Sequence, residues 1–485
     1  MSYKFAVIGG GIAGVTCAET LSSLCPEEQI VLITASKLIK AVTNYQQVSR
    51  TLEQFDVEER PMSSMETGCP NVKVIHKMMK TLDTVKHALT MDDGTVIQYG
   101  LLCICTGGKP KVICKDNDHV LGIRDTESVQ DFQKRLKQAR RIVVVGNGGI
   151  ATELVCEIEG CEVIWAIKHS SVTSTFIDPG AATFCLPKLN EEKPKSDEPL
   201  KRRKYTEQDT DVDSSGNKIP SGSALGPDWV NNLEMSGADK KGHCVHVEYK
   251  VEVANILTRE ELLSSGKSET QQSVLTSTNS DWPVFVELTN GTVYGCDFVV
   301  SATGVVPNTL PFHDNNFKLA EDGGIQVNDK MQTSETDVYA AGDVCTACWE
   351  HAQHWLQMRL WSQARQMAAY AAKCMVAHTC NESISMDFCF EVFAHVTKFF
   401  NYKVILLGRF NAQGLGTNYE LLLRVTKGVE YVKAVLQDGR LQGAILIGET
   451  DLEETFENLI LNQTDLTPFK EHLLDPNIDI EDFFD

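Results

Sequence analysis

The sequence has no apolar run long enough to cross a membrane. A spanning helix needs about 18 to 20 apolar residues in succession, and no stretch of the 485 residues approaches that length. Positive charge is also scarce, with 45 Lys and Arg against 66 Asp and Glu and a net charge of −21. Because a protein held on nucleic acid by its overall field must neutralise phosphates with cations, we expect neither membrane insertion nor direct nucleic-acid binding.

Two common catalytic motifs are missing as well. The chain has no Gly-x-Ser-x-Gly nucleophile turn and no phosphate-binding P-loop with its lysine. Its sixteen cysteines are spread over the whole length, whereas disulfide scaffolds are typical of short secreted chains. The first apolar strand begins at Tyr3 and runs directly into glycines, so we expect no signal peptide and a cytoplasmic protein with reduced thiols.

What is present is a folded chain with a repeated motif. At roughly 150 residues per domain, the length predicts about three domains. Residues 5–8 (FAVI) lead into Gly9, Gly11 and Gly14, and an apolar helical run follows. In such a turn the first glycine permits a tight bend, the second lets backbone N–H groups approach a pyrophosphate, and the third lets helix and strand pack closely.

The same pattern returns 137 residues later. Residues 141–145 (RIVVV) lead into Gly146, Gly148 and Ala151, where alanine is an accepted third residue. Two such turns, each between a strand and a helix, predict two dinucleotide-binding units.

Neither unit has the usual ribose-binding acid about 20 residues further on. The first unit offers Ser36, whose hydroxyl could bond a ribose. The second offers Lys168, which either attracts a 2′-phosphate or is a solvated strand end. NADH and NADPH therefore both stay open.

Residues 184–282 form an apparent insertion. They are rich in Lys, Glu, Ser, Asp and Gly, and only the stretch 244–253 looks like a strand. Such a composition favours disorder for much of the segment. The cluster 201–204 (KRRK) is either a nuclear localisation signal or a solvated charge run, so a nuclear as well as a cytoplasmic location stays open.

The last third of the chain predicts a separate domain. We expect a long helix from just after Asp343 to about residue 380, followed by antiparallel strands at 388–407, 420–425, 430–436 and 444–447. The segment 449–485 holds twelve acids and one lysine. It is either a solvated acidic end or a docking segment with aromatic anchors.

Four further strand ends carry small residues, at 101–108 (LLCICTGG), 298–304 (FVVSATG), 306–308 (VPN) and 333–343 (TSETDVYAAGD). In this order, and with the two glycine turns, the chain resembles the FAD-dependent pyridine nucleotide-disulphide oxidoreductase family. The resemblance implies an α/β fold with two Rossmann-like domains, which bind FAD and NAD(P)H, and a C-terminal α+β domain. The expected segments are 1–117 and 306–380 for the FAD domain, 118–305 for the NAD(P)H domain and 381–485 for the C-terminal domain.

The resemblance also implies roles for single residues. The three glycines of the first turn would cradle the FAD pyrophosphate, Thr106 and Gly107 would close over the FAD, and Asp343 would bind its ribityl chain. The cofactor-binding residues expected are then Gly9, Gly11, Gly14, Ser36, Thr106, Gly107, Gly342 and Asp343 for FAD, and Gly146, Gly148, Ala151 and Lys168 for NAD(P)H.

Two charged residues are the expected catalytic pair. Glu153 matches the family glutamate beside the flavin and the nicotinamide, and Lys40 is the candidate for its usual lysine partner. An ion pair there would orient the rings and place a cation near flavin N5, which would stabilise the reduced flavin. Alternatively, Glu153 is an ordinary acid in the first turn of a helix.

The family's redox cysteines are missing. Disulphide reductases of this family carry Cys-x4-Cys or a single cysteine near where this chain has residues 42–44 (VTN). Cys345 and Cys348 form a Cys-x2-Cys pair, but they follow the Gly-Asp turn and point toward the pyrophosphate end. With His351 and His354 they form a series of metal-type ligands spaced three residues apart. On one helix, the first and last of these four residues would stand about 13 Å apart, too far to bind one zinc ion. We expect neither a sulfur relay nor a metal.

Two functions stay open. In the first, an enzyme passes hydride from NAD(P)H to FAD and then to an unidentified acceptor. In the second, a binding protein with little turnover changes its affinity for a partner with cofactor state, and the insertion and acidic tail order on binding. The resemblance implies a partner for either function, an RtcB-type tRNA ligase whose active-site cysteine is sensitive to oxidation.

Overall fold

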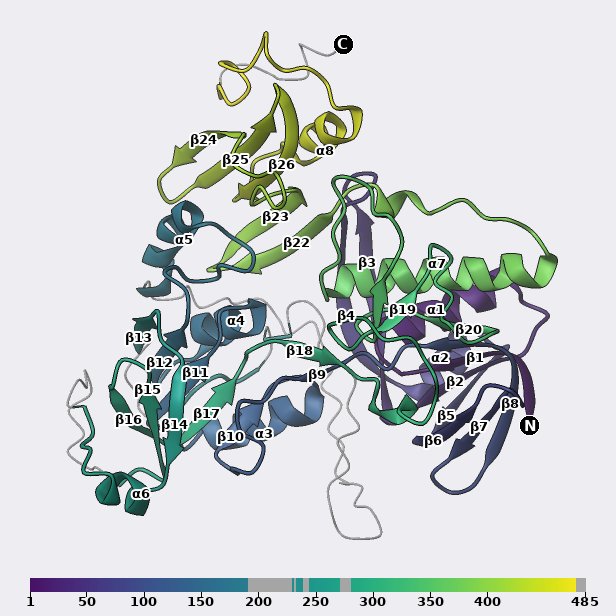
Figure 1. Cartoon of the computed structure of the whole chain (residues 1–485), viewed down its shortest axis with the longest axis horizontal. Helices are drawn as coiled ribbons and strands as arrows, with labels where there is room; N and C mark the ends of the chain where they lie inside the picture. Colours follow the sequence, from purple (N-terminus) through teal and green to yellow (C-terminus); the bar gives the residue numbers. More distant parts are fainter. Residues whose placement is uncertain (191–228, 231–232, 239–243, 271–280, 477–485) are drawn as a thin grey trace.

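The computed structural model describes residues 1–190, 229–230, 233–238, 244–270 and 281–476. Within these ranges the chain forms three parts, each built on its own sheet (Figure 1). The basic cluster 201–204 and the last residues, 477–485, lie outside the described residues.

The first domain is a mainly parallel sheet. Strands β5 (Val72–His76), β2 (Ile30–Thr34), β1 (Ser2–Ile8) and β8 (Val96–Ile104) lie side by side, and β20 (Val338–Ala340) pairs with the second half of β8. The antiparallel strands β7 (Ala88–Met91) and β6 (Met79–Asp83) extend the sheet along the first half of β8. Helix α1 (Ile12–Leu24) packs against α7 (Trp361–Cys380), and α2 (Met62–Gly68) precedes β5. Residues 5–8 of β1, 30–33 of β2 and 101–104 of β8 are apolar and buried, because both faces of the sheet are covered there.

A long hairpin leaves this sheet. Strands β3 (Leu38–Gln47) and β4 (Glu53–Pro61) pair so that Lys40 lies opposite Glu59. The tip of the hairpin reaches the third domain, where Leu52 is fully buried in that domain's core. The hairpin therefore connects two domains that are far apart in the sequence.

The second domain repeats the parallel arrangement. Its sheet runs β10 (Val120–Gly122), β17 (Phe298–Ser301), β11 (Arg141–Val145), β12 (Glu162–Ile167) and β13 (Cys244–Tyr249). Helices α3 (Thr126–Leu136), α4 (Gly149–Glu157) and α5 (Pro179–Cys185) belong to it, as does an antiparallel sheet of β14 (Val253–Leu257), β15 (Val284–Leu288) and β16 (Val293–Cys296). The strands β9 (Gly108–Pro110) and β18 (Val305–Pro307) pair between the first and second domains (Figure 1).

Part of the expected insertion belongs to this second domain. The strand predicted near residues 244–253 is present as β13, which pairs with β12 along its whole length, and α6 (Arg259–Ser264) follows β14. The sequence predicts neither β14 nor α6, because most of their side chains are half-exposed or exposed and they lack the apolar run of the buried strands.

The third domain is the predicted antiparallel sheet. Strands β22 (Ala394–Phe399), β23 (Tyr402–Gly408), β26 (Arg440–Ile447), β25 (Glu430–Gln437) and β24 (Glu420–Thr426) lie in that order, and α8 (Glu453–Asn462) packs on them. The first part of the expected acidic tail is thus not a solvated end. It forms α8, where Phe456 and Glu457 are fully buried, because apolar residues at helical spacing alternate with the acids.

The helix predicted to follow Asp343 begins later than expected. Residues 344–360 contain the short strand β21 (Cys345–Ala347), which pairs with β19 (Ile325–Val327), and α7 starts only at Trp361. Cys345 and Ala347 are buried by this pairing, so a contact with a distant strand overrides the local pattern. In the described part of the chain no helix is both long enough and apolar enough to cross a membrane.

We predict that a buried ion pair fastens the third domain to the second. Lys433 Nζ lies 2.7 Å from Asp178 Oδ2, and the lysine side chain is 4% exposed. Because removal of one partner leaves a charge without compensation, Lys433→Ala should lower the free energy of unfolding by about 3 kcal/mol. Denaturant titration measures this, with Lys73→Ala as the control. Lys73 forms an exposed pair with Glu66, so Lys73→Ala should leave the unfolding midpoint close to that of the wild type.

We also predict that His395 contributes to acid sensitivity. Its side chain is 1% exposed on β22, and burial lowers the pKa of the imidazole to about 3. Between about pH 6.5 and pH 3 the unfolded chain binds a proton that the folded chain excludes, so stability falls as the pH falls. His395→Gln should reduce this slope by up to about 1.4 kcal/mol per pH unit. An unchanged slope, equal to that of the exposed-site control His313→Gln, would contradict the prediction.

Candidate functional site

One continuous cavity of about 2270 Å³ lies between the first and second domains and reaches the third. Both glycine turns line it, and His395 and Phe399 of the third domain line its far end. Cavities for single drug-sized ligands have volumes of about 300 to 1,000 Å³. This cavity therefore has room for two dinucleotides.

The two glycine turns have the same geometry. Gly9 has φ +124° and Gly146 has φ +137°, values that only glycine adopts readily. A Cβ on Gly9 would lie 2.1 Å from the Cys105 carbonyl oxygen, and one on Gly146 would lie 2.1 Å from that of Ala302. In each unit the turn thus passes directly over the end of a neighbouring strand.

The second and third residues of each glycine motif have different roles. Gly11 and Gly148 are the N-caps of α1 and α4, and a Cβ on either would meet nothing within 4 Å, so their backbone opens onto the cavity. Gly14 packs beneath the turn, where a Cβ would lie 1.8 Å from Gly9 O, and Ala151 is fully buried. The open positions present helix N-termini to an anion, and the packed ones hold helix and strand together.

Thr106 and Gly107 close the first turn from the other side. Thr106 Oγ1 donates to Asn308 O over 3.0 Å, and the Asn308 N–H donates to Gly107 O over 2.8 Å. This cross-link ties the end of β8 to the segment after β18. Asn308 Oδ1 is buried and, among the described residues, has no hydrogen-bond partner, so it can accept a hydrogen bond from a ligand.

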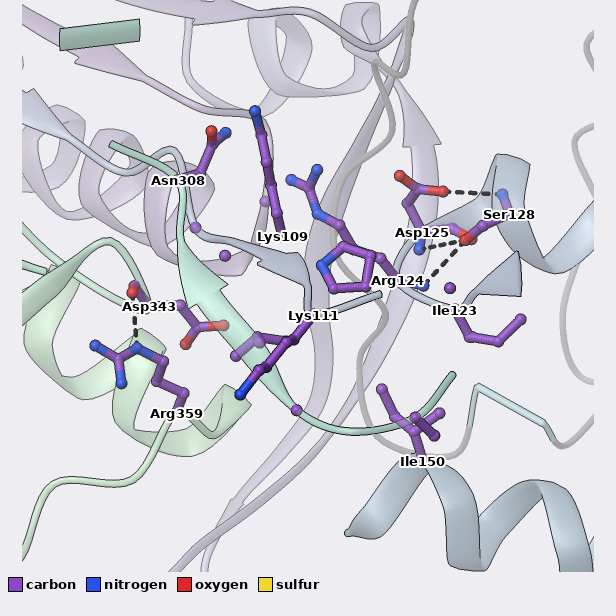
Figure 2. Close-up of a pocket in the computed structure, with 18 of the residues that line it drawn as sticks. Lys109, Lys111, Ile123, Arg124, Asp125, Ser128, Ile150, Asn308, Asp343 and Arg359 are labelled. Carbon is purple, nitrogen blue, oxygen red and sulfur yellow. Dashed lines mark hydrogen bonds between the residues drawn. The ribbon is translucent and has the colours of Figure 1, made fainter. Parts of the chain in front are cut away.

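Three cations face this part of the cavity. Figure 2 shows Lys109, Lys111 and Arg124 on neighbouring segments of the wall. Burial and the nearby Arg124 lower the pKa of Lys109. Within the described part of the chain, Arg124 Nε is buried without an acceptor. Because such donors are costly to leave unpaired, the cluster fits a bound anion such as a pyrophosphate.

Asp343 faces the same space from the first domain. It follows Gly342, which takes φ +79° at the turn, and the guanidinium of Arg359 donates to the Asp343 backbone carbonyl over 2.9 Å (Figure 2). Burial raises the pKa of Asp343, while Arg359 and Arg124 act against that shift. A carboxylate in such a site accepts hydrogen bonds from ligand hydroxyls. The wall therefore fits the polyol and pyrophosphate of FAD.

The two candidate ribose residues differ in position. Lys168 is exposed at the end of β12 and lines the cavity, beside His169. Ser36 is buried, and its hydroxyl accepts the N–H of Leu38 over 3.2 Å, while the neighbouring Lys37 lines the cavity. The serine hydroxyl thus serves the local turn, and Lys37 is the residue that the sequence reasoning missed.

Lys40 and Glu153 have different partners from those expected. Lys40 is 4% exposed, and its ammonium donates to Glu59 over 2.5 Å and to Thr126 over 3.2 Å. Thr126 lines the cavity, so Lys40 lies behind that part of the wall. Glu153 lines the cavity and accepts a hydrogen bond from Trp229. Recognition of the β3–β4 hairpin would have placed Glu59 opposite Lys40, whereas no local signal pointed to Trp229.

The two residues of the Cys-x2-Cys pair differ in exposure. Cys345 is buried, which raises its pKa, whereas Cys348 is exposed. All sixteen cysteines are free. The four residues of the Cys and His series do not share one helix, because their segment contains β21. Among the described residues, no group of three or more His, Cys, Asp or Glu could hold a metal ion.

Comparison with known proteins identifies the family. Residues 3–193 and 259–368 match the family model for pyridine nucleotide-disulphide oxidoreductases, and residues 394–464 match the rubredoxin NAD+ reductase C-terminal domain. The chain is 57% identical to pyridine nucleotide-disulfide oxidoreductase domain-containing protein 1 of Mus musculus, covering 99% of this chain and 98% of that protein. The corresponding protein of Drosophila melanogaster is 44% identical over 99% of both chains.

Solved structures share the fold at low sequence identity. The putidaredoxin reductase–putidaredoxin complex aligns with a TM-score of 0.67 at 15% identity, covering 99% of this chain and 98% of that one. NADH:rubredoxin oxidoreductase from Clostridium acetobutylicum aligns with a TM-score of 0.57 at 16% identity, covering 96% and 97%. The predicted fold of two dinucleotide-binding domains and a C-terminal domain is confirmed. The chain belongs to the pyridine nucleotide-disulphide oxidoreductase family, which makes it an NAD(P)H-dependent flavin oxidoreductase.

Proposed function

We propose that the protein passes hydride from NAD(P)H to FAD and then to an acceptor without a cysteine relay. FAD and NAD(P)H are its cofactors. The observation that carries the proposal is the continuous cavity onto which both glycine turns open, because it would bring two dinucleotides together in one shared space. FAD supplies the two-electron chemistry, and the protein supplies binding and orientation.

Each wall of the cavity has a separate task in this proposal. The N-termini of α1 and α4, with Lys109 and Arg124, bind the negative pyrophosphates. Asp343 and Asn308 offer oxygen acceptors to hydroxyls and amides. The third domain borders the far end with His395, Thr397 and Phe399, which shield the reacting groups from water.

The absence of a cysteine relay rests on sequence and position. The residues that follow the first glycine turn on β3 are Val42, Thr43 and Asn44, and none of them carries sulfur. Cys345 lies in β21, buried beneath the Gly-Asp turn. A small acceptor that takes electrons directly from the flavin, such as oxygen or a quinone, suits this arrangement better than a disulfide.

We further propose that this activity protects a partner from oxidation in the cytoplasm and the nucleus. An RtcB-type tRNA ligase, whose active site uses an oxidation-sensitive cysteine, is the partner that the family resemblance implies. The alternative, a binding protein with little turnover, makes a different prediction. In that case NAD(P)H would give a long-lived reduced complex instead of rapid consumption with a defined acceptor. Stopped-flow absorbance with NADH and with NADPH separates the two.

We predict that the purified protein is yellow and that Asp343→Ala loses its flavin. Removal of the carboxylate deletes an acceptor for the FAD ribityl hydroxyls in a buried site, where an unpaired hydroxyl costs about 1 to 3 kcal/mol. The ratio of flavin to protein absorbance measures the loss. The remote variant Asp83→Ala should keep full flavin content. A colourless wild-type protein that does not take up FAD would refute the cofactor assignment.

We predict opposite shifts of the flavin reduction potential for Lys40 and Glu59. A cation near the flavin stabilises its anionic reduced form, and Glu59 compensates that cation. Lys40→Ala should therefore lower the potential and slow reduction, and Glu59→Gln should raise the potential. A change of about 1.4 kcal/mol corresponds to about 30 mV for two electrons. Dye-coupled redox titration of the FAD-loaded variants measures both shifts.

The matched control for this prediction is the double variant Cys345→Ser, Cys348→Ser. It should keep the wild-type potential and anaerobic reduction within a few-fold. A hundredfold loss of rate, about 2.7 kcal/mol of transition-state stabilisation, would show instead that this cysteine pair takes part in electron transfer.

A further inference from the structure

The indole of Trp229 contacts Glu153 inside the cavity. Trp229 Nε1 donates to Glu153 Oε2 over 2.7 Å, and both residues line the cavity. An indole N–H is a donor only, so the carboxylate must accept in this contact. A hydrogen bond to a carboxylate is roughly twice as strong as one between neutral groups. The contact therefore favours the charged form of Glu153 and fixes one of its oxygens.

Packing holds the indole in place. Trp229 is 9% exposed and belongs to an apolar cluster that includes Phe176 and Phe399. Those two rings lie 5.2 Å apart, and both line the cavity near Gly149 at the start of α4. A buried aromatic side chain has few torsions to order, so it fixes the direction of its donor at low entropic cost.

The indole carries no charge, and this distinguishes it from a lysine. The ammonium of Lys40 already donates to Glu59 and Thr126. Because its donor is the neutral indole of Trp229, this hydrogen bond orients the Glu153 carboxylate in the cavity without adding a positive charge to it. When dihydronicotinamide gives up hydride, its neutral ring becomes a cationic nicotinamide. A fixed carboxylate stabilises the positive charge that develops in that step.

We propose that Trp229 is a positioning residue for hydride donation, whose indole N–H holds the Glu153 carboxylate toward the nicotinamide. The proposal rests on the proposed function, since it assigns Glu153 to the nicotinamide end of the cavity. It adds a residue from the segment between α5 and β13 to a site that the two glycine turns otherwise define.

The charged groups on the elements that pack against α4 bear on any pH profile of Glu153. Helix α4 packs against β11 and β22. Strand β11 brings Arg141, which is paired with Glu162 at the start of the strand. Strand β22 brings the exposed Lys398 and His395, and burial lowers the pKa of His395 to about 3.

A second cavity carboxylate, Glu127 on α3, must be separated from Glu153. Burial raises the pKa of Glu127, so it could also contribute an acid limb to a binding profile. Glu127→Gln should leave unchanged the acid limb of the nicotinamide-binding profile that we assign to Glu153, and Glu153→Gln should remove that limb.

The test is binding of the oxidised nicotinamides NAD+ and NADP+ to the FAD-loaded protein between pH 4.5 and 8.5. Trp229→Phe keeps the ring and loses the donor. It should weaken binding about 3- to 10-fold at neutral pH and move the acid limb up by about 1 pH unit, because the carboxylate loses a charge-stabilising hydrogen bond. Trp229→His, which keeps a ring N–H, should recover part of the lost affinity and reverse part of the shift of the acid limb. Trp349→Phe, a tryptophan in a separate aromatic cluster, should change neither.

Anaerobic stopped-flow reduction of the same variants completes the test. Trp229→Phe should slow flavin reduction without changing flavin content. Wild-type affinity and an unshifted acid limb in Trp229→Phe would overturn the proposal, even if NAD(P)H reduces the wild-type flavin and the proposed function stands. If Trp229→Phe does not fold, an acid limb of the binding profile that persists in Glu153→Gln would overturn the proposal. Failure of NAD(P)H to reduce the wild-type flavin would refute the proposed function separately.

Discussion

The carbonyl oxygens of Cys105 and Ala302 lie where a Cβ on Gly9 or Gly146 would have to be. Because Gly9 and Gly146 have no Cβ, each turn can cross the end of the neighbouring parallel strand at close range. That crossing sets the direction of α1 and α4, whose N-termini then open onto one cavity. The binding of both cofactors therefore depends on two backbone approaches that no other residue permits.

Charge is arranged around this cavity in separate groups. Lys109, Lys111 and Arg124 line the cavity on neighbouring segments of its wall (Figure 2), where a bound pyrophosphate would supply the opposite charge. Lys40 is compensated within its own hairpin by Glu59. Glu153 accepts a hydrogen bond from the neutral indole of Trp229. In the proposed function, Lys40 would then act on the flavin and Glu153 on the nicotinamide, because the two residues have separate partners.

The third domain completes the site although it carries neither glycine turn. Glu457, fully buried, accepts the N–H groups of Arg50 and Thr51 at the tip of the β3–β4 hairpin. Lys433 reaches Asp178 of the second domain. These contacts fasten the third domain to both others, so that His395 and other side chains of β22 form the far wall of the cavity.

The sequence by itself determined the parts of this protein that are local. The two glycine turns, the strand ends at Thr106 and Asp343, and the strands of the third domain follow from patterns of a few residues. The family resemblance predicted the fold of two dinucleotide-binding domains and a C-terminal domain. Only the tertiary structure decided that Glu59 and Trp229 are the partners of the expected catalytic pair. The same holds for β21, which pairs with a distant strand where the local pattern predicted helix. Such contacts join segments tens to hundreds of residues apart, and no periodicity within either segment encodes them.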